Sequence, residues 1–167
     1  WALGLRTSND CSLAHGLLAG RRVFVCDNMA FSGDAIVLSR KHTNGISLDR
    51  EIDRGISRFI ERQEGLTTRI EALRGRDLSE EQASRVIVAA FDRKVLPLRL
   101  VKPVIDNFFH TTPEQPDCQG RTAWALHNCF TRAFRDLPMT SQMRYSERLG
   151  ALFGITEAGK ARVEILN

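Results

Sequence analysis

The sequence feature that most constrains the fold is a mostly apolar stripe with a seven-residue repeat within residues 46–74. Its members recur at alternating steps of four and three, and they are Ile52, Ile56, Phe59, Gln63, Leu66, Ile70 and Leu73. That spacing places all of them on one side of an α-helix. Ser47 precedes the stripe and Gly75 follows it, as expected for the two ends of a helix. The segment therefore predicts a rod of about 42 Å, at 1.5 Å per residue.

The stripe has two interpretations. In the first, which we favour, it packs within its own chain, against a sheet or against later helices. In the second, it forms a coiled coil with a second chain, with Gln63 as the polar residue that sets the register. The residues of this homo-oligomer interface would be Ile52, Phe59, Leu66 and Leu73. Three heptads are near the minimum for such pairing, so the homo-oligomer is kept as the alternative.

Residues 1–43 have a different pattern, with short apolar segments between turn-forming residues. The alternation of Trp1, Leu3 and Leu5 predicts a strand over residues 1–7, and further strands are predicted over residues 17–27 and 35–39. Ser, Asn, Asp and Gly separate these segments, as in tight turns. Because translation does not begin at tryptophan, we expect an N-terminal portion before Trp1.

Four further helices are predicted after Gly75. Ser79 and Gln82 form a capping-box pattern at the start of a helix that ends before Leu96. The others are a short helix over residues 103–109 with Pro103 in its first turn, and helices over residues 122–134 and 141–153. The predicted class is α+β, with a small antiparallel sheet at the N-terminal end followed by a helical majority that includes one long helix. Residues 1–153 would form one domain, and residues 154–167 a tail.

Composition places the chain among soluble globular proteins. The chain has 167 residues, 43% of them hydrophobic and 26% charged, and no apolar run approaches the roughly 20 residues that span a bilayer. Four cysteines, Cys11, Cys26, Cys118 and Cys129, match neither a zinc knuckle nor a Cys-x-x-Cys redox pair. We therefore expect free thiols, with Cys26 and Cys129 as small buried hydrophobes, in a reducing, cytoplasmic setting.

No complete catalytic signature is present in the sequence. It has no phosphate-binding GxxxxGK[ST] loop, no GxGxxG fingerprint, no GxSxG elbow and no HExxH helix. These absences favour a protein that is not an enzyme and needs no cofactor, with a divalent cation as the one alternative.

That alternative depends on polar residues at the ends of the predicted strands. If those ends converge, Asp10, Asp27 and His42 could ligate a divalent cation or transfer protons, as in a metal-dependent hydrolase or nuclease. The stronger interpretation is structural, because Asp and Asn at strand ends close turns with their own side chains. We therefore expect Asp27 and Asn28 to close a buried strand.

The segment 121–131 is a second candidate site. Trp124 and Asn128 are four residues apart and share a helix face, so Asn128 could hydrogen-bond another element or bind a ligand beside a large aromatic ring. Arg121 lies at the helix start, where the helix dipole disfavours a cation, which indicates a specific carboxylate partner. Structural packing is the favoured interpretation of both features.

Nucleic-acid binding is the third possibility. A net charge of +4 and a pI near 9.2 permit contact with phosphates. Basic residues flank the predicted sheet, and the candidates are Arg6, Arg21, Arg22, Arg40 and Lys41. A single strand of nucleic acid could follow that basic edge, although no aromatic stacking platform is identifiable.

Two stretches of the chain carry a resemblance to a known family. "SNDCSLAHGLLAGRRVFVCDNMAFSGD", with the later "KHT", and "RTAWALHNCFTRAF" resemble a bacterial domain-of-unknown-function family of phage- and plasmid-like proteins. The residues that carry it are Asn9, Asp10, Cys26, Asp27, Asn28, His42, Arg121, Trp124 and Asn128. Relatives show Asn-Ser-His-Asp where this chain has residues 7–10, so Asn9 replaces the histidine of that pattern. The resemblance implies a mobile-element setting and an intracellular location.

These observations give three hypotheses. The leading one is a non-enzymatic accessory protein that contacts single-stranded nucleic acid, in binding or annealing, or a nucleic-acid-processing partner protein. The second is the metal-dependent hydrolase or nuclease, and the third is an oligomeric assembly module without a membrane role.

Overall fold

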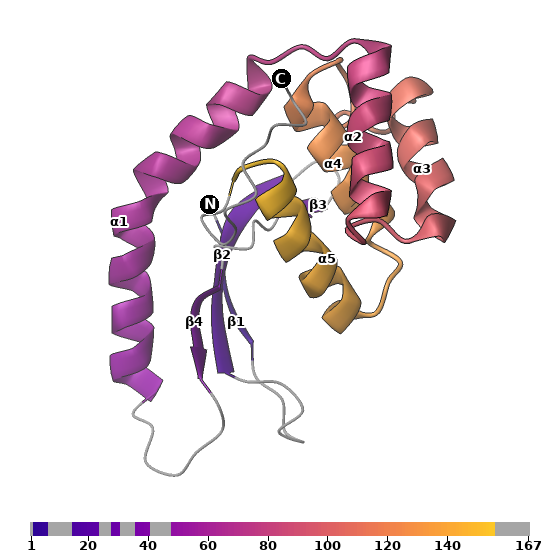
Figure 1. The fold of residues 1–167 in the computed structure, drawn as a ribbon. Helices are drawn as coiled ribbons and strands as arrows, with labels where there is room; N and C mark the ends of the chain where they lie inside the picture. The colour runs from indigo at the N-terminus through magenta and orange to yellow at the C-terminus, as the bar shows by residue number, and fades with distance from the viewer. Residues whose placement is uncertain (1, 7–14, 24–27, 31–35, 41–47, 156–167) are drawn as a thin grey trace.

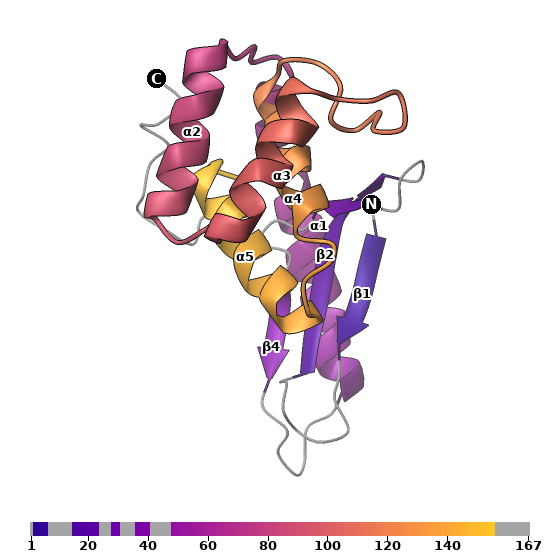
Figure 2. The same ribbon diagram turned by 90° about the vertical axis from the view of Figure 1, so that its right-hand side faces the viewer.

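A computed structural model describes residues 2–6, 15–23, 28–30, 36–40 and 48–155 of the chain. Nine elements follow one another in these ranges, four strands and then five helices. The longest helix, α1, runs along one side of the strands, and α5 lies on their other side (Figures 1 and 2). The helices α2, α3 and α4 gather near the upper end of the strands, on the side away from α1 (Figure 1).

The helix α1 (Leu48–Arg74) confirms the long helix predicted from the seven-residue repeat. Its first part lies against β4 and β2, and α1 also contacts α4. Leu66, Ile70 and Leu73 are each about 5–6% exposed and belong to the hydrophobic core of this chain. The C-terminal part of the stripe therefore packs within its own chain, as the favoured interpretation predicted. The side chains of Phe59 and Gln63 lie outside the described residues.

The helix α2 (Glu80–Asp92) begins with the predicted capping box. The Ser79 hydroxyl accepts a hydrogen bond from the backbone N–H of Gln82 at 3.2 Å, and the Gln82 side-chain oxygen accepts one from the backbone N–H of Ser79 at 2.9 Å. Two backbone donors that a helix start would leave unpaired are satisfied in this way. Val86, Ile87 and Ala90 are buried, whereas Phe91 stays 41% exposed.

The prediction for α3 was wrong in extent. The helix spans Leu98–Phe109, Pro97 is its N-cap, and Pro103 lies inside it rather than in its first turn. The remaining helices, α4 (Ala123–Ala133) and α5 (Met139–Leu152), agree with prediction to within about two residues at each end.

The core forms around α4. Ten of its residues are buried, including Leu126, Cys129 and Phe130, which are fully enclosed. Phe108 of α3, Leu149 of α5 and Phe134 surround them. A helix that is apolar on most sides must be enclosed on most sides, and α4 contacts α1, α3 and α5.

Four antiparallel strands are described by their backbone. The central strand β2 (His15–Val23) pairs with β1 (Ala2–Arg6), with β4 (Ile36–Arg40) and, toward its C-terminal end, with β3 (Asn28–Ala30). The strands overlap the three predicted segments, but β2 ends at Val23, and β3 was not predicted.

The predicted α+β class is nevertheless wrong for the packed domain. Among the residues whose side chains the structure describes, about 69% are helical and none lies in a strand. Every residue of the described hydrophobic core lies between Leu66 and Ile155, in helices and their connections. The domain is therefore classified as helical, because helix packing builds its core. The sequence prediction gave too much weight to the strand-like pattern of residues 1–43.

Candidate functional site

The two sequence stretches that carried the family resemblance meet in the fold. The helix α4 corresponds to the second stretch and contacts β3, whose first residue is Asn28 of the first stretch. About 90 residues of sequence separate them. Of the other residues in the first stretch, Asn9, Asp10, Cys26 and Asp27 lie outside the described residues, as does His42.

Buried polar groups tie the segment before α4 to that helix. The Asn128 amide nitrogen donates to the Asp117 carbonyl oxygen at 2.9 Å, and Arg132 Nη1 lies 3.5 Å from Asp117 Oδ1. The Asp117 side chain is only 1% exposed, so the guanidinium compensates a charge that is almost fully removed from water. Asn128 therefore hydrogen-bonds the protein backbone, as the structural interpretation expected.

A second set of amides extends this cluster to α3. Asn107 Nδ2 donates to the Cys129 carbonyl at 3.4 Å, and Gln115 Nε2 donates to Asn107 Oδ1 at 3.2 Å. Two buried acceptors, Gln115 Oε1 and Asn128 Oδ1, have no hydrogen-bond partner in the described part of the chain. Buried amide oxygens of this kind are commonly satisfied by an enclosed water molecule.

His127 lies on another side of α4, in an aromatic environment. Its ring stacks parallel to that of Trp124, with centroids 5.1 Å apart, and meets the Phe153 ring edge-on at 5.3 Å. Neither ring nitrogen has a hydrogen-bond partner among the described residues. Burial lowers the pKa of His127 to about 4, and the neighbouring Asn128 side chain opposes that shift. The imidazole is therefore neutral at pH 7.

The two described cysteines, Cys118 and Cys129, are free, as predicted. Both are buried, which had been predicted for Cys129. Burial raises the pKa of the Cys129 thiol, and the adjacent Cys118 thiol and Asp117 carboxylate raise it further. A thiol held in its protonated form is a poor nucleophile and a poor metal ligand. The helix α4 therefore presents a neutral His127 imidazole and a protonated Cys129 thiol, which suit packing.

Arg121 has the carboxylate partner that its position predicted. Its Nη2 atom lies 3.8 Å from Glu80 Oε1, across an exposed gap between the starts of α4 and α2. Its guanidinium also lies over the rings of Phe108 and Phe109, at 5.4 and 5.2 Å from their centroids. Arg121, at the start of α4, therefore contacts residues of both α2 and α3.

The residues of the predicted strand-end cation site lie outside the part of the chain that the structure describes. These residues are Asp10, Asp27 and His42. Within the described ranges, no group of three His, Cys, Asp or Glu side chains could hold a metal ion.

The predicted basic edge of the sheet divides into two groups. The backbone register pairs Arg6 with Gly16 and Arg40 with His15, at the start of β2, whereas Arg21 and Arg22 pair with β3 near its end. Five residues of strand separate the groups, which is about 17 Å. The backbone therefore places two of the four arginines near each end of β2, and Lys41 lies outside the described residues.

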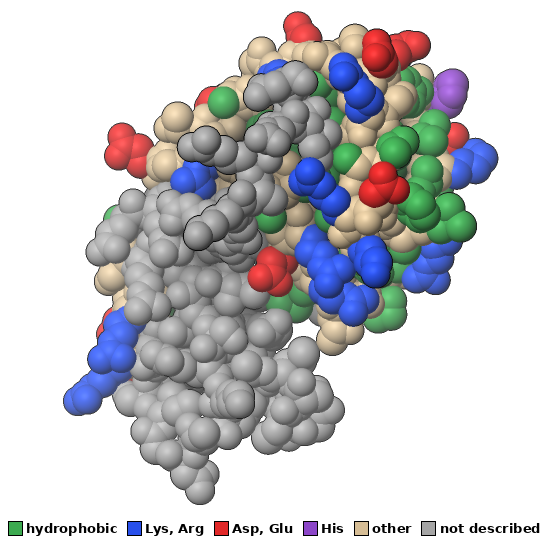
Figure 3. Space-filling model, in the orientation of Figure 1, with side chains coloured by type: hydrophobic (Ala, Val, Ile, Leu, Met, Phe, Trp, Pro, Cys, Tyr) green, Lys and Arg blue, Asp and Glu red, His purple; other side chains and the backbone are tan. Residues whose placement is uncertain are grey.

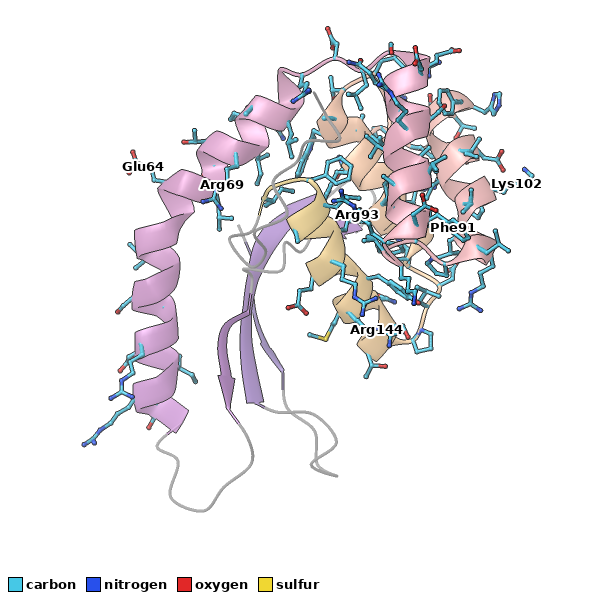
Figure 4. All side chains as sticks on the ribbon, viewed as in Figure 1. Glu64, Arg69, Phe91, Arg93, Lys102 and Arg144 are labelled. Carbon is cyan, nitrogen blue, oxygen red and sulfur yellow. The ribbon has the colours of Figure 1, made fainter. Side chains whose placement is uncertain are left out.

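A basic surface that the sequence analysis missed lies on the helical part. Four exposed cations from the turn after α2 and from α5 form it, namely Arg93, Lys94, Arg144 and Arg148. Arg148 Nη1 donates to the Lys94 carbonyl at 2.9 Å and joins the two segments. Lys and Arg side chains gather over α5 and the end of α2 in Figure 3, and Figure 4 shows Arg93 and Arg144 on that side. The i, i+4 spacing of Arg144 and Arg148 was the only local signal.

Lys94 has an unusual backbone conformation. Its φ of 57° is left-handed, and no other non-glycine residue in the described ranges has a positive φ. A side chain in this region costs roughly 1 kcal/mol relative to glycine. Non-glycine residues are uncommon in this region, and such backbone outliers cluster at functional sites.

Comparison of the sequence with protein-family models shows which family the chain belongs to. The chain belongs to the family described as "Domain of unknown function (DUF932)", which matches residues 2–144. The match therefore covers the strands, α1 to α4 and the first part of α5. Comparisons with curated proteins and with solved structures find no significant match. No helix in the described part of the chain is long and apolar enough to cross a membrane.

Proposed function

We propose that the protein is a non-enzymatic accessory protein of a phage- or plasmid-derived locus, and that it associates with single-stranded nucleic acid through the basic surface. The observation that carries this proposal is the gathering of Arg93, Lys94, Arg144 and Arg148 from segments about 50 residues apart. Cations that track a phosphate backbone supply most of the affinity in sequence-independent binding. The left-handed Lys94 adds support, because backbone outliers of this kind cluster at functional sites.

Acidic residues near the basic surface reduce its positive electrostatic potential. Asp92 ends α2, Glu147 lies on α5, and Asp136 lies in the connection before α5. The surface therefore carries a modest positive excess, and we expect salt-sensitive binding of moderate affinity.

The test is fluorescence anisotropy of a labelled oligothymidylate and of a labelled duplex against the full chain at several salt concentrations. Arg144→Gln should weaken single-strand binding and reduce the slope of log K against log salt by about 0.7, the value for one phosphate contact. Arg50→Gln is the matched control, because it removes the same charge from an exposed position near the far end of α1.

A third variant separates this surface from the sheet. Arg21→Ala with Arg22→Ala should leave the affinity unchanged if the helical surface binds the nucleic acid. A loss with this variant, and none with Arg144→Gln, would place the contact on the sheet and contradict the proposed surface. No salt-sensitive binding of either oligonucleotide would contradict the function itself.

A further inference from the structure

The exposed large apolar side chains concentrate on two helices. Five such side chains occur in the described part of the chain, and four of them lie on α2 and α3. These four, called the α2–α3 face, are Val88, Phe91, Leu98 and Ile105, with exposed fractions of 59%, 41%, 73% and 36%. Single exposed apolar residues need no explanation, but a concentration of them on adjacent elements indicates an interaction site.

The spacing of the four residues places each pair on one side of its helix. Val88 and Phe91 are three residues apart on α2, and Leu98 and Ile105 are seven apart on α3, so each pair lies on one stripe of its helix. The helices contact each other and are joined by the short turn 93–97. Hydrophobic side chains extend over α2 and α3 on this side in Figure 3, and Phe91 is labelled there in Figure 4.

The protein's own core does not account for the face. Ala83, Val86, Ile87 and Ala90 supply the buried side of α2, and Val104 and Phe108 supply that of α3. The four residues of the α2–α3 face are not among these buried residues, and part of their apolar area stays in water. Covering these side chains with a partner would remove that apolar area from water, which is favourable.

Charge distinguishes one end of the face from the other. The turn between the helices and the start of α3 carry Arg93, Lys94 and Arg99 against one acid, Asp92. Along α3 the exposed Lys102 pairs with Asp106, so that part of the face is close to neutral. A ligand that matches both properties has apolar anchors along its length and acidic groups at the end that lies over the turn.

We propose that the α2–α3 face binds an amphipathic segment of a partner protein, helical when bound, with apolar anchors and acidic residues at one end. Amphipathic helices place anchors at i, i+3 or i+4 and i+7 against such apolar surfaces. The complementary charge fixes the orientation and speeds the encounter. The inference goes beyond nucleic-acid association and does not involve Arg144.

The experiment uses a fluorescein-labelled synthetic peptide of about four helical turns, with Leu and Phe at i, i+4 and i+7 and three Glu at one end. Two versions place the acidic end at the N- or the C-terminus, and a third replaces Glu by Lys. Titration with the full chain should give saturable anisotropy for one acidic version. Leu98→Ser should weaken that binding at least about tenfold, as expected for a lost anchor.

A matched control is available on α1. Ile60 is 63% exposed and lies outside the face, so Ile60→Ser should leave peptide binding unchanged. Arg99→Glu should weaken binding of the acidic peptide and strengthen binding of the Lys peptide. Arg144→Gln should leave peptide binding unchanged, so that failure of this inference can be told from failure of the nucleic-acid proposal.

Four results would overturn the inference. The first is that neither acidic peptide saturates binding at about 1 mM, and the second is that Leu98→Ser and Ile60→Ser weaken peptide binding equally. The third is concentration-dependent self-association of the chain that Leu98→Ser abolishes. The fourth is that Leu98→Ser weakens oligonucleotide binding and leaves peptide binding unchanged. The first two exclude a specific protein site. The third makes a second copy of the chain the occupant, and the fourth makes the face part of the nucleic-acid site.

Discussion

His127 is a titratable residue held neutral inside the helical core. Its pKa is about 4 in the folded chain, against 6.5 for an unperturbed histidine, which is the value expected in the unfolded chain. The unfolded chain therefore binds the proton more readily between these values, and the free energy of unfolding falls as the pH drops from about 6.5 to about 4. The full loss is on the order of 3 kcal/mol, because one pKa unit corresponds to about 1.4 kcal/mol.

The prediction is that His127→Phe removes this part of the pH dependence. Denaturant unfolding at pH 7, 5.5 and 4.5 should show a smaller decrease for the variant than for the wild type. His110→Gln is the control, because His110 is exposed and its replacement should leave the decrease unchanged. An unchanged pH dependence in His127→Phe would mean that other groups account for the acid sensitivity.

Lys94 gives a second prediction at the scale of one residue. Lys94→Gly should raise the free energy of unfolding by about 1 kcal/mol, because glycine adopts φ near 57° without strain. Arg93→Gly should lower the free energy of unfolding. Arg93 has an ordinary φ of −81°, so glycine relieves no strain there and only increases the entropy of the unfolded chain. If Lys94→Gly also weakens oligonucleotide binding, stability and charge have opposite effects at this position, as the proposed function requires.

At the scale of one element, α1 contains an exposed glycine in its interior. A Cβ atom added at Gly65 would meet no atom of the described residues within 4 Å. Gly65→Ala should therefore raise the free energy of unfolding by about 0.5–1 kcal/mol, measured by chemical denaturation. Gly120→Ala is the opposite case, because Gly120 has a φ of 91° and its replacement should destabilise the protein.

The sequence predicted elements well where the signal was local. The repeat from Ile52 to Leu73 and the Ser79 capping box both depend on spacings of three or four residues, and the structure reproduces them. The start of α3 was wrong, because Pro103 is acceptable at a helix start and also inside a helix whose partners compensate the lost hydrogen bond. Pro97, which lies immediately before the helix, was the better signal.

The candidate sites were less predictable for a physical reason. Arg148 reaches the Lys94 carbonyl only because the fold brings α5 to the turn after α2, and no local pattern encodes that contact. Asn128 was identified correctly as a polar residue on an apolar helix, but its partner, the Asp117 carbonyl, belongs to an irregular segment.

At the scale of the whole molecule, the enclosure of α4 predicts how the domain opens. Amides of α4 should exchange with deuterium only through global unfolding, because α1, α3 and α5 all contact this helix. Amides on the exposed side of α2, near Val88, should exchange through smaller openings. Native-state hydrogen exchange measured by mass spectrometry at increasing denaturant would show whether α4 is the last element to open.

The stacked pair of Trp124 and His127 also gives the protein a built-in optical probe. The two rings are stacked and nearly parallel, with 6° between their planes. A protonated imidazole quenches indole emission, whereas a neutral one does so far less, so the fluorescence of Trp124 should record the charge on its neighbour. The chain has two tryptophans, and Trp1→Phe would leave Trp124 as a single emitter. Partner binding, unfolding and protonation could then all be followed without attaching a label.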